Sequence, residues 1–247
     1  MKLHMENNAL EFKQVGPAAW IPLNSPAAMN AINLNMIDKY EELLPKIAED
    51  SSVKVLVITG NGTAFCAGAD LKEILVSNDG PAGEADFIDR LTVNVLDVLR
   101  NFPKPVIAAI NGITMAGGLE TAMFADIVIA ADSARIGDAH ANYGVYPGAG
   151  GAAVLPRLIP LNVAKYLLFT GETLSAEEMR GYGFVNKVVS PDSLQEEVQK
   201  LAELIAEKSP IALKRMKVVA NASADKSRDD ALQQEQVLFR AHMRSYD

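Results

Sequence analysis

The fold of this chain is decided by INGITMAGGLETAMFADIVIA, residues 110–130, together with NGTAFCAGADLKEI, residues 61–74. In each stretch a turn of small residues follows an apolar run and precedes a helical pattern. Two such turns can direct two backbone N–H groups at one point, where they would stabilise a developing oxyanion. The first stretch also places Glu120 three residues after Gly117, one helical turn further on. The sequence therefore predicts a catalytic site between the two turns.

Gly117 and Gly118 open the predicted helix. Free N–H groups at a helix start favour an anion, and glycine lets a ligand approach the backbone closely. Taken by themselves, the two glycines are explained more simply by tight helix–strand packing. The CAGAD turn at 66–70 favours the oxyanion interpretation, because Ala69 supplies a matching N–H. One such donor is worth about 2.7–4 kcal/mol in the transition state, and a substrate carbonyl held this way is easier to enolise.

Glu120 lies among apolar neighbours, including Leu119 and Ala122, so a solvated helix face is the less favoured interpretation. A partly desolvated carboxylate has a raised pKa and can exchange protons near neutral pH. His140, in GDAHANYG, can be an acid, a base, a ligand or a packing residue, and the sequence alone favours packing. No cluster has metal-ligand spacing and no GxSxG elbow is present, so neither a metal site nor a serine triad is predicted.

Composition restricts the class of protein. The chain has 247 residues, 49% of them hydrophobic, a net charge of −8 and a single cysteine, Cys66. The negative charge without a basic block argues against a nucleic-acid partner, and one cysteine excludes an internal disulfide framework and fits a reducing compartment. No apolar run reaches the roughly 18 residues of a membrane span, and the N-terminus lacks the pattern of a signal peptide. These features predict a cytoplasmic location with no membrane partner.

The pattern along the chain predicts strands alternating with helices. Hairpin-like strands are expected within 8–23, and Asn33 is expected to cap the next helix. This alternation ordinarily indicates a doubly wound sheet, but the phosphate-binding GxGxxG and GxxxxGK[ST] motifs are missing. The other expected elements are strands at 53–59, 105–111, 126–131, 135–137 and 184–190, a loop at 76–83, a helix at 85–102, helical segments within 148–170, and helices at 193–208, 210–223 and 228–245. After Pro191 only helical patterns follow, and this change divides the chain into a core of strands and helices, 1–190, and a helical region, 191–247.

Four motifs, in order, resemble those of the enoyl-CoA hydratase/isomerase (crotonase) superfamily. They are AMNAI at 28–32, AFCAGADLKEI, KPVIAAINGITMAGGLETAMFADIVIAA and YGVYPGAGG. The similarity runs from about residue 10 to 245. It implies an α/β fold, a spiral of ββα turns with C-terminal helices that form trimers, often paired as hexamers. It also implies a further short helix beyond Asp247 that helps to cover the acyl pocket, so the size of that pocket is left open.

The resemblance assigns roles to individual residues. Ala69 and Gly117 correspond to the oxyanion-hole donors, and Glu120 corresponds to the first catalytic glutamate. CoA is part of the substrate, so no separate cofactor is expected. The expected substrate-binding residues are Ala28, Met29, Ala67, Gly68, Asp70, Leu71, Lys72, Gly118, Tyr143 and Pro147.

One position departs from the pattern: His140 lies where hydratases carry a second catalytic glutamate. Hydratases use two carboxylates to hold and split one water. A histidine can still donate a proton or hold that water, but it cycles between neutral and +1. Because simple isomerases shuttle the proton at this second position, the departure argues more against an isomerase than against a hydratase. Tyr143 and Tyr146 can add hydroxyls or belong to the core.

Three hypotheses follow. The first is a hydro-lyase that adds water to an α,β-unsaturated acyl-CoA. The second is another CoA-thioester reaction on the same oxyanion hole: isomerisation, decarboxylation or C–C hydrolysis. The third is a non-catalytic acyl-CoA binding protein. Glu120 argues against the third hypothesis, and His140 keeps the second open.

Overall fold

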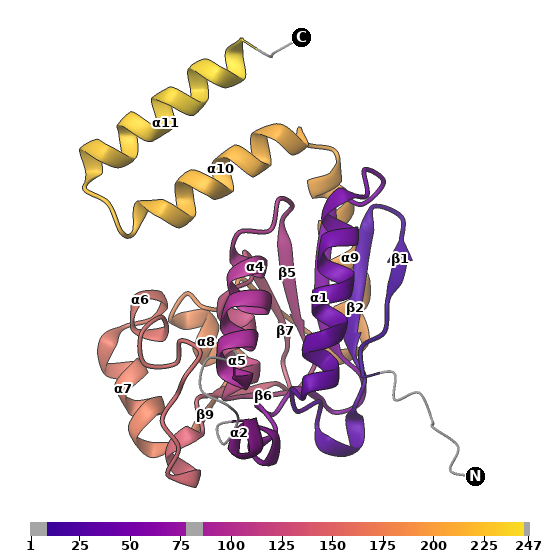
Figure 1. The fold of residues 1–247 in the computed structure, drawn as a ribbon, viewed down its shortest axis with the longest axis vertical. Helices are drawn as coiled ribbons and strands as arrows, with labels where there is room; N and C mark the ends of the chain where they lie inside the picture. Colours follow the sequence, from indigo (N-terminus) through magenta and orange to yellow (C-terminus); the bar gives the residue numbers. More distant parts are fainter. Residues whose placement is uncertain (1–8, 78–85, 245–247) are drawn as a thin grey trace.

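The structure, a computed structural model, describes residues 9–77 and 86–244. Most of the loop expected at 76–83 therefore lies outside the described residues. A six-stranded sheet forms the centre of the fold (Figure 1), and its strand order is β1-β2-β3-β5-β7-β10. Only the β1–β2 pair is antiparallel. The strands are β1 (Lys13–Val15), β2 (Ala18–Leu23), β3 (Val55–Gly60), β5 (Val106–Ile110), β7 (Ile127–Ala131) and β10 (Lys187–Val189).

Both faces of this sheet are covered, which explains the continuous apolar runs of its central strands. On one face, alternate residues such as Leu56 and Ile58 pack with helix α1 (Leu34–Glu49). On the other face, Val57 and its neighbours pack against α9 (Leu194–Ala206). Asn33 caps α1 as predicted, because its side chain accepts a hydrogen bond from Met36 N at 2.9 Å.

A second sheet of four short strands has the order β4-β6-β8-β9. In three successive turns of the chain, a long strand of the first sheet is followed directly by a short strand of the second and then by a helical segment. This is the expected spiral of ββα turns, and the fold prediction is confirmed. Of the four short strands only β8, at 135–137, was predicted. The strands are β4 (Ala64–Cys66), β6 (Ile113–Met115), β8 (Arg135–Gly137) and β9 (Thr173–Ser175), and the helical segments are α2 (Leu71–Ser77), α5 (Gly117–Met123) and the 3-10 helix η3 (His140–Tyr143).

The helix expected at 85–102 is present but irregular. It begins as α3 (Phe87–Asp89), becomes a π-helical segment over Arg90–Leu96 and ends as α4 (Asp97–Arg100). π-helical turns are rare and are often found at functional sites. The remaining elements are η1 (Pro26–Ala28), α6 (Leu155–Leu158), α7 (Leu161–Thr170), α8 (Ala176–Gly181) and η4 (Pro191–Ser193).

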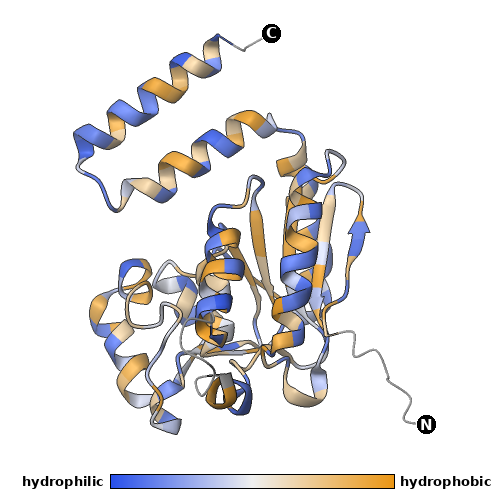
Figure 2. Ribbon diagram, in the orientation of Figure 1, coloured by the Kyte–Doolittle hydropathy of each residue, from blue (hydrophilic) through white to orange (hydrophobic). Residues whose placement is uncertain are grey.

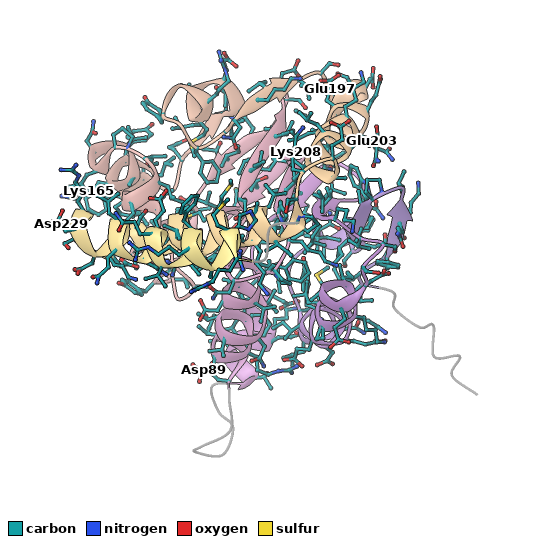
Figure 3. All side chains as sticks on the ribbon, turned by 90° about the horizontal axis from the view of Figure 1, so that it is seen from above. Asp89, Lys165, Glu197, Glu203, Lys208 and Asp229 are labelled. Atoms are coloured by element: carbon teal, nitrogen blue, oxygen red, sulfur yellow. The ribbon has the colours of Figure 1, made fainter. Side chains whose placement is uncertain are left out.

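The last two helices, α10 (Pro210–Ser223) and α11 (Arg228–Met243), lie beyond the sheets (Figure 1). Neither contains a fully buried residue, and hydrophobic positions recur along both (Figure 2). Exposed Asp229 lies at the start of α11, which crosses the molecule in Figure 3. Among the described residues, no helix is long and apolar enough to span a membrane.

Candidate active site

A cavity of about 520 Å³ lies where the β4–α2 turn, the β6–α5 turn and η3 meet. The fold thus brings together ten of the residues expected from the sequence. They are Ala67, Gly68, Ala69, Asp70, Leu71, Lys72, Gly117, Glu120, His140 and Tyr143. Seven further residues complete the wall: Ile74, Ile88, Leu91, Ala116, Val145, Tyr146 and Gly148.

The N–H groups of Ala69 and Gly117 lie next to each other in this wall. Ile32 forms a parallel bridge with Ala69: its N–H donates to Gly68 O and its carbonyl accepts from Asp70 N, both at 2.8 Å. The Ala69 N–H therefore points away from Ile32. Gly117 is the first residue of α5, so its N–H has no acceptor within the helix. A Cβ added to Gly117 would lie 3.3 Å from Ala69 N, so the two donors border one small space.

The backbone at the second turn is strained. Ala116, the N-cap of α5, has φ 47° and ψ −119°, a conformation that residues other than glycine rarely adopt. Such strain costs on the order of 1–3 kcal/mol and is found mainly at functional sites. The two turns also touch, since a Cβ added to Gly68 would lie 3.1 Å from the Ala116 Cβ. Close contact between the turns fixes the positions of both N–H groups.

Glu120 is buried, with 3% of its surface exposed. Its Oε1 accepts hydrogen bonds from the N–H groups of Ala149 and Gly151, both at 3.0 Å. Burial raises the pKa of Glu120, although these N–H groups and the charge of His140 oppose the shift. A carboxylate fixed in this way can take a proton from a bound water and return it. The two N–H donors were not predicted, although they belong to the YGVYPGAGG motif that the sequence analysis singled out.

His140 also lines the cavity, with 13% of its side chain exposed. Its Nδ1 lies 3.0 Å from Oδ1 of Asp138, whose side chain is 1% exposed. Burial favours the neutral imidazole, but the Asp138 hydrogen bond and the charges of Asp138 and Glu120 outweigh it and raise the pKa of His140. The structure therefore differs from the packing role that the sequence favoured, because His140 faces the cavity with a carboxylate behind it. Asp138 was missed, since nothing in its local pattern marks it.

Four predicted substrate-binding residues, Ala28, Met29, Gly118 and Pro147, are not part of the described cavity wall. A Cβ added to Gly118 would lie 2.1 Å from Cys66 O, so this glycine serves close helix–strand packing. Met29 is tied to the site through its carbonyl, which accepts from Ala67 N at 3.0 Å.

The two tyrosines stand at the rim of the cavity. Tyr143 and Tyr146 are 71% and 80% exposed, so neither belongs to the core. Within 9–77 and 86–244, no three His, Cys, Asp or Glu side chains are grouped so that they could hold a metal ion.

Comparison with known proteins gives one consistent result. The family model described as Enoyl-CoA hydratase/isomerase matches residues 16–247. The chain is 35% identical to the short-chain-enoyl-CoA hydratase of Clostridium acetobutylicum, over 95% of this chain and 89% of that protein. It is 37% identical to the crotonyl-CoA hydratase of Syntrophomonas wolfei, over 92% and 86%. The crystal structure of an enoyl-CoA hydratase from Bacillus anthracis superposes with a TM-score of 0.89 at 33% identity, covering 97% of this chain and 92% of that one.

Proposed function

Because the chain belongs to the enoyl-CoA hydratase/isomerase family, we propose that it is a hydro-lyase that adds water across the double bond of an α,β-unsaturated acyl-CoA. The observation that carries this proposal is the position of Glu120. Its buried carboxylate, fixed by two backbone N–H groups, shares one cavity with the Ala69 and Gly117 N–H groups. Addition of water to the double bond of an unsaturated thioester requires a proton acceptor beside an oxyanion hole, and this site has both.

In the proposed reaction, Glu120 takes a proton from water as the water oxygen bonds to Cβ of the substrate. The electron pair of the carbon–carbon double bond moves through Cα onto the thioester oxygen, which the Ala69 and Gly117 N–H groups stabilise. The imidazolium of His140 then gives a proton to Cα and the thioester carbonyl re-forms. The product gains one water. Transfer of one proton from Glu120 to His140 restores the starting charges.

The rest of the cavity suits the two parts of such a substrate. Ile74, Ile88 and Leu91 supply an apolar wall for an acyl chain, and Leu91 comes from the π-helical segment. Lys72 lies on α2, the helix that also supplies Ile74, and its ammonium can bind a CoA phosphate. We propose acyl-CoA as the ligand, with no separate cofactor.

We also propose that the protein works as a trimer or as a pair of trimers. The support lies in α10 and α11, whose apolar side chains remain open to solvent in the single chain. Ile211, Met216, Val237 and Phe239 are 53%, 64%, 55% and 61% exposed. Sedimentation at micromolar concentration tests this proposal, and a stable monomer would contradict it.

His140 keeps one alternative open: a different CoA-thioester reaction at the same oxyanion hole. The experiment that separates the possibilities is incubation with a panel of acyl-CoAs, with products identified by mass. A gain of one water supports hydration; an unchanged mass with a moved double bond indicates isomerisation, and loss of carbon dioxide or of an acyl fragment indicates decarboxylation or C–C hydrolysis. Glu120→Gln is the matched control, because it keeps the side-chain shape but cannot exchange the proton. Tight binding without turnover in the wild type would indicate an acyl-CoA binding protein.

A further inference from the structure

Asp138 lies directly behind His140 and outside the cavity wall. Its Oδ1 accepts from the backbone N–H of His140 at 3.3 Å and pairs with the ring Nδ1 at 3.0 Å. Its Oδ2 is buried and has no hydrogen-bond partner among the described residues. Burying a carboxylate with one oxygen unpaired is costly unless a cation compensates its charge. Within the described part of the chain, His140 is the one side chain that forms an ion pair with Asp138.

The backbone is shaped around this pair. Ala139, between the two residues, has φ 60° and ψ −7°, the left-handed conformation, although it is not a glycine. That turn brings the His140 ring back over the Asp138 carboxylate. On the far side, a Cβ added to Gly151 would lie 2.5 Å from Asp138 Oδ2. The carboxylate is therefore closely packed and has little freedom to leave the imidazole.

We propose that Asp138 is a positioning residue that acts through His140: it holds the proton on Nδ1, turns Nε2 toward the cavity and favours the imidazolium in the resting protein. The inference rests on the proposed function in one respect, because the imidazolium is the group that gives its proton to Cα. A carboxylate–imidazole pair also keeps the ring from rotating, so that Nε2 stays at one position relative to the substrate.

Other charged groups also affect the protonation of the His140 imidazole, and they contribute to its expected titration midpoint. Glu120 adds a negative charge from α5, which also favours the imidazolium. The remaining titratable side chains of the cavity wall are Asp70, Lys72, Tyr143 and Tyr146. The Asp138 contribution is isolated by changing that residue alone while the rest of the cavity is kept.

The first test follows the His140 ring by nitrogen-15 NMR in the free protein. The chain has three histidines, so comparison with His140→Gln identifies the signals. In the wild type we expect a protonated Nδ1 and a titration midpoint above the ordinary imidazole value of about 6.5. In Asp138→Asn the amide keeps the size but loses the charge, and the midpoint should fall by at least ~1 pH unit. Asp132→Asn, which removes an exposed carboxylate six residues away, should leave the midpoint unchanged.

The second test is kinetic. Asp138→Asn should lower kcat at least ~10-fold, part of the roughly 10²–10⁴-fold that general acid–base catalysis supplies. Added to His140→Gln, the same change should lower kcat by less than about twofold, because the partner through which it acts is gone.

Two results would overturn the inference. One is an unchanged His140 midpoint in a folded Asp138→Asn. The other is an equal loss of kcat in the wild-type and His140→Gln backgrounds, which would make Asp138 merely structural. The NMR result needs no substrate, so failure of the proposed hydration would leave this test intact.

Discussion

The adjacent glycines Gly117 and Gly118 should respond in opposite ways to the same added methyl group. A Cβ at Gly117 would enter the space between the oxyanion donors, with its nearest contacts at 3.3–3.4 Å. A Cβ at Gly118 would lie 2.1 Å from the Cys66 carbonyl oxygen and 2.8 Å from the carbonyl carbon. The first methyl group needs only a few tenths of an ångström of adjustment, whereas the second forces the helix away from β4.

Gly117→Ala should therefore fold almost normally and lose activity. Its methyl group keeps the thioester oxygen away from the Ala69 N–H, which is equivalent to losing one donor. The expected loss of kcat is about 10²–10³-fold, or about 2.7–4 kcal/mol. Gly118→Ala should instead lower the free energy of unfolding by at least ~1–3 kcal/mol, the usual cost of overpacking.

Urea unfolding measures the loss of stability, and product formation, monitored by mass spectrometry, measures the loss of activity. Retention of most of the activity in a stable Gly117→Ala would refute the placement of the oxyanion between these N–H groups. Equal destabilisation in both variants would show that Gly117, like Gly118, serves packing.

Further outcomes are expected at three residues, Glu120, His140 and Lys217. Glu120→Gln should lower kcat by roughly 10²–10⁴-fold with little change in CoA-thioester affinity, measured by calorimetry, because the amide keeps the shape and loses the proton exchange; equal losses of rate and affinity would contradict this. His140→Gln should remove a limb of the pH–rate profile, because the amide cannot titrate; an identical profile at unchanged rate would remove His140 from the mechanism. The pKa of His140 is raised in the folded protein, so protonation of this residue stabilises the fold at low pH. Chemical denaturation should show this contribution to the free energy of unfolding disappearing as the pH rises through the folded pKa. The same trend should be absent from His140→Gln. Lys217→Met should cost about 1.5–3 kcal/mol of unfolding free energy, because Lys217, whose side chain is 9% exposed, donates to Asp126 at 2.6 Å, and its loss removes the cation beside a carboxylate that is 22% exposed; the exposed Lys200→Met serves as the control and should cost at most about 1 kcal/mol.

Local sequence patterns determined much of this protein. The long strands could be predicted because strands buried on both faces are continuous apolar runs. Helix α1 could be predicted from its Asn33 cap and its helical spacing of apolar residues. The two small-residue turns indicated the Ala69 and Gly117 donors, and the apolar neighbours of Glu120 predicted its burial. Each of these signals lies within one turn or one element, so it needs no knowledge of the rest of the chain.

Short elements could not be predicted in the same way. Strands β4, β6 and β9 have three residues each, too few for a period to be recognised; only β8, of the same length, was predicted. The π-helical segment over Arg90–Leu96 looks in the sequence like an ordinary amphipathic helix, yet it supplies Leu91 to the cavity wall.

Only the tertiary structure decided how the site is completed. Ala149 and Gly151 donate to Glu120 across separations of 29 and 31 residues, which no local pattern encodes. Asp138 and His140 are close in sequence, but their pairing depends on the left-handed Ala139, a conformation that alanine does not favour and that surrounding contacts must impose. The sequence thus indicated the proposed acid–base residue and the proposed oxyanion-hole donors, while folding supplied the groups that hold them in place, because those contacts join segments that meet only in three dimensions.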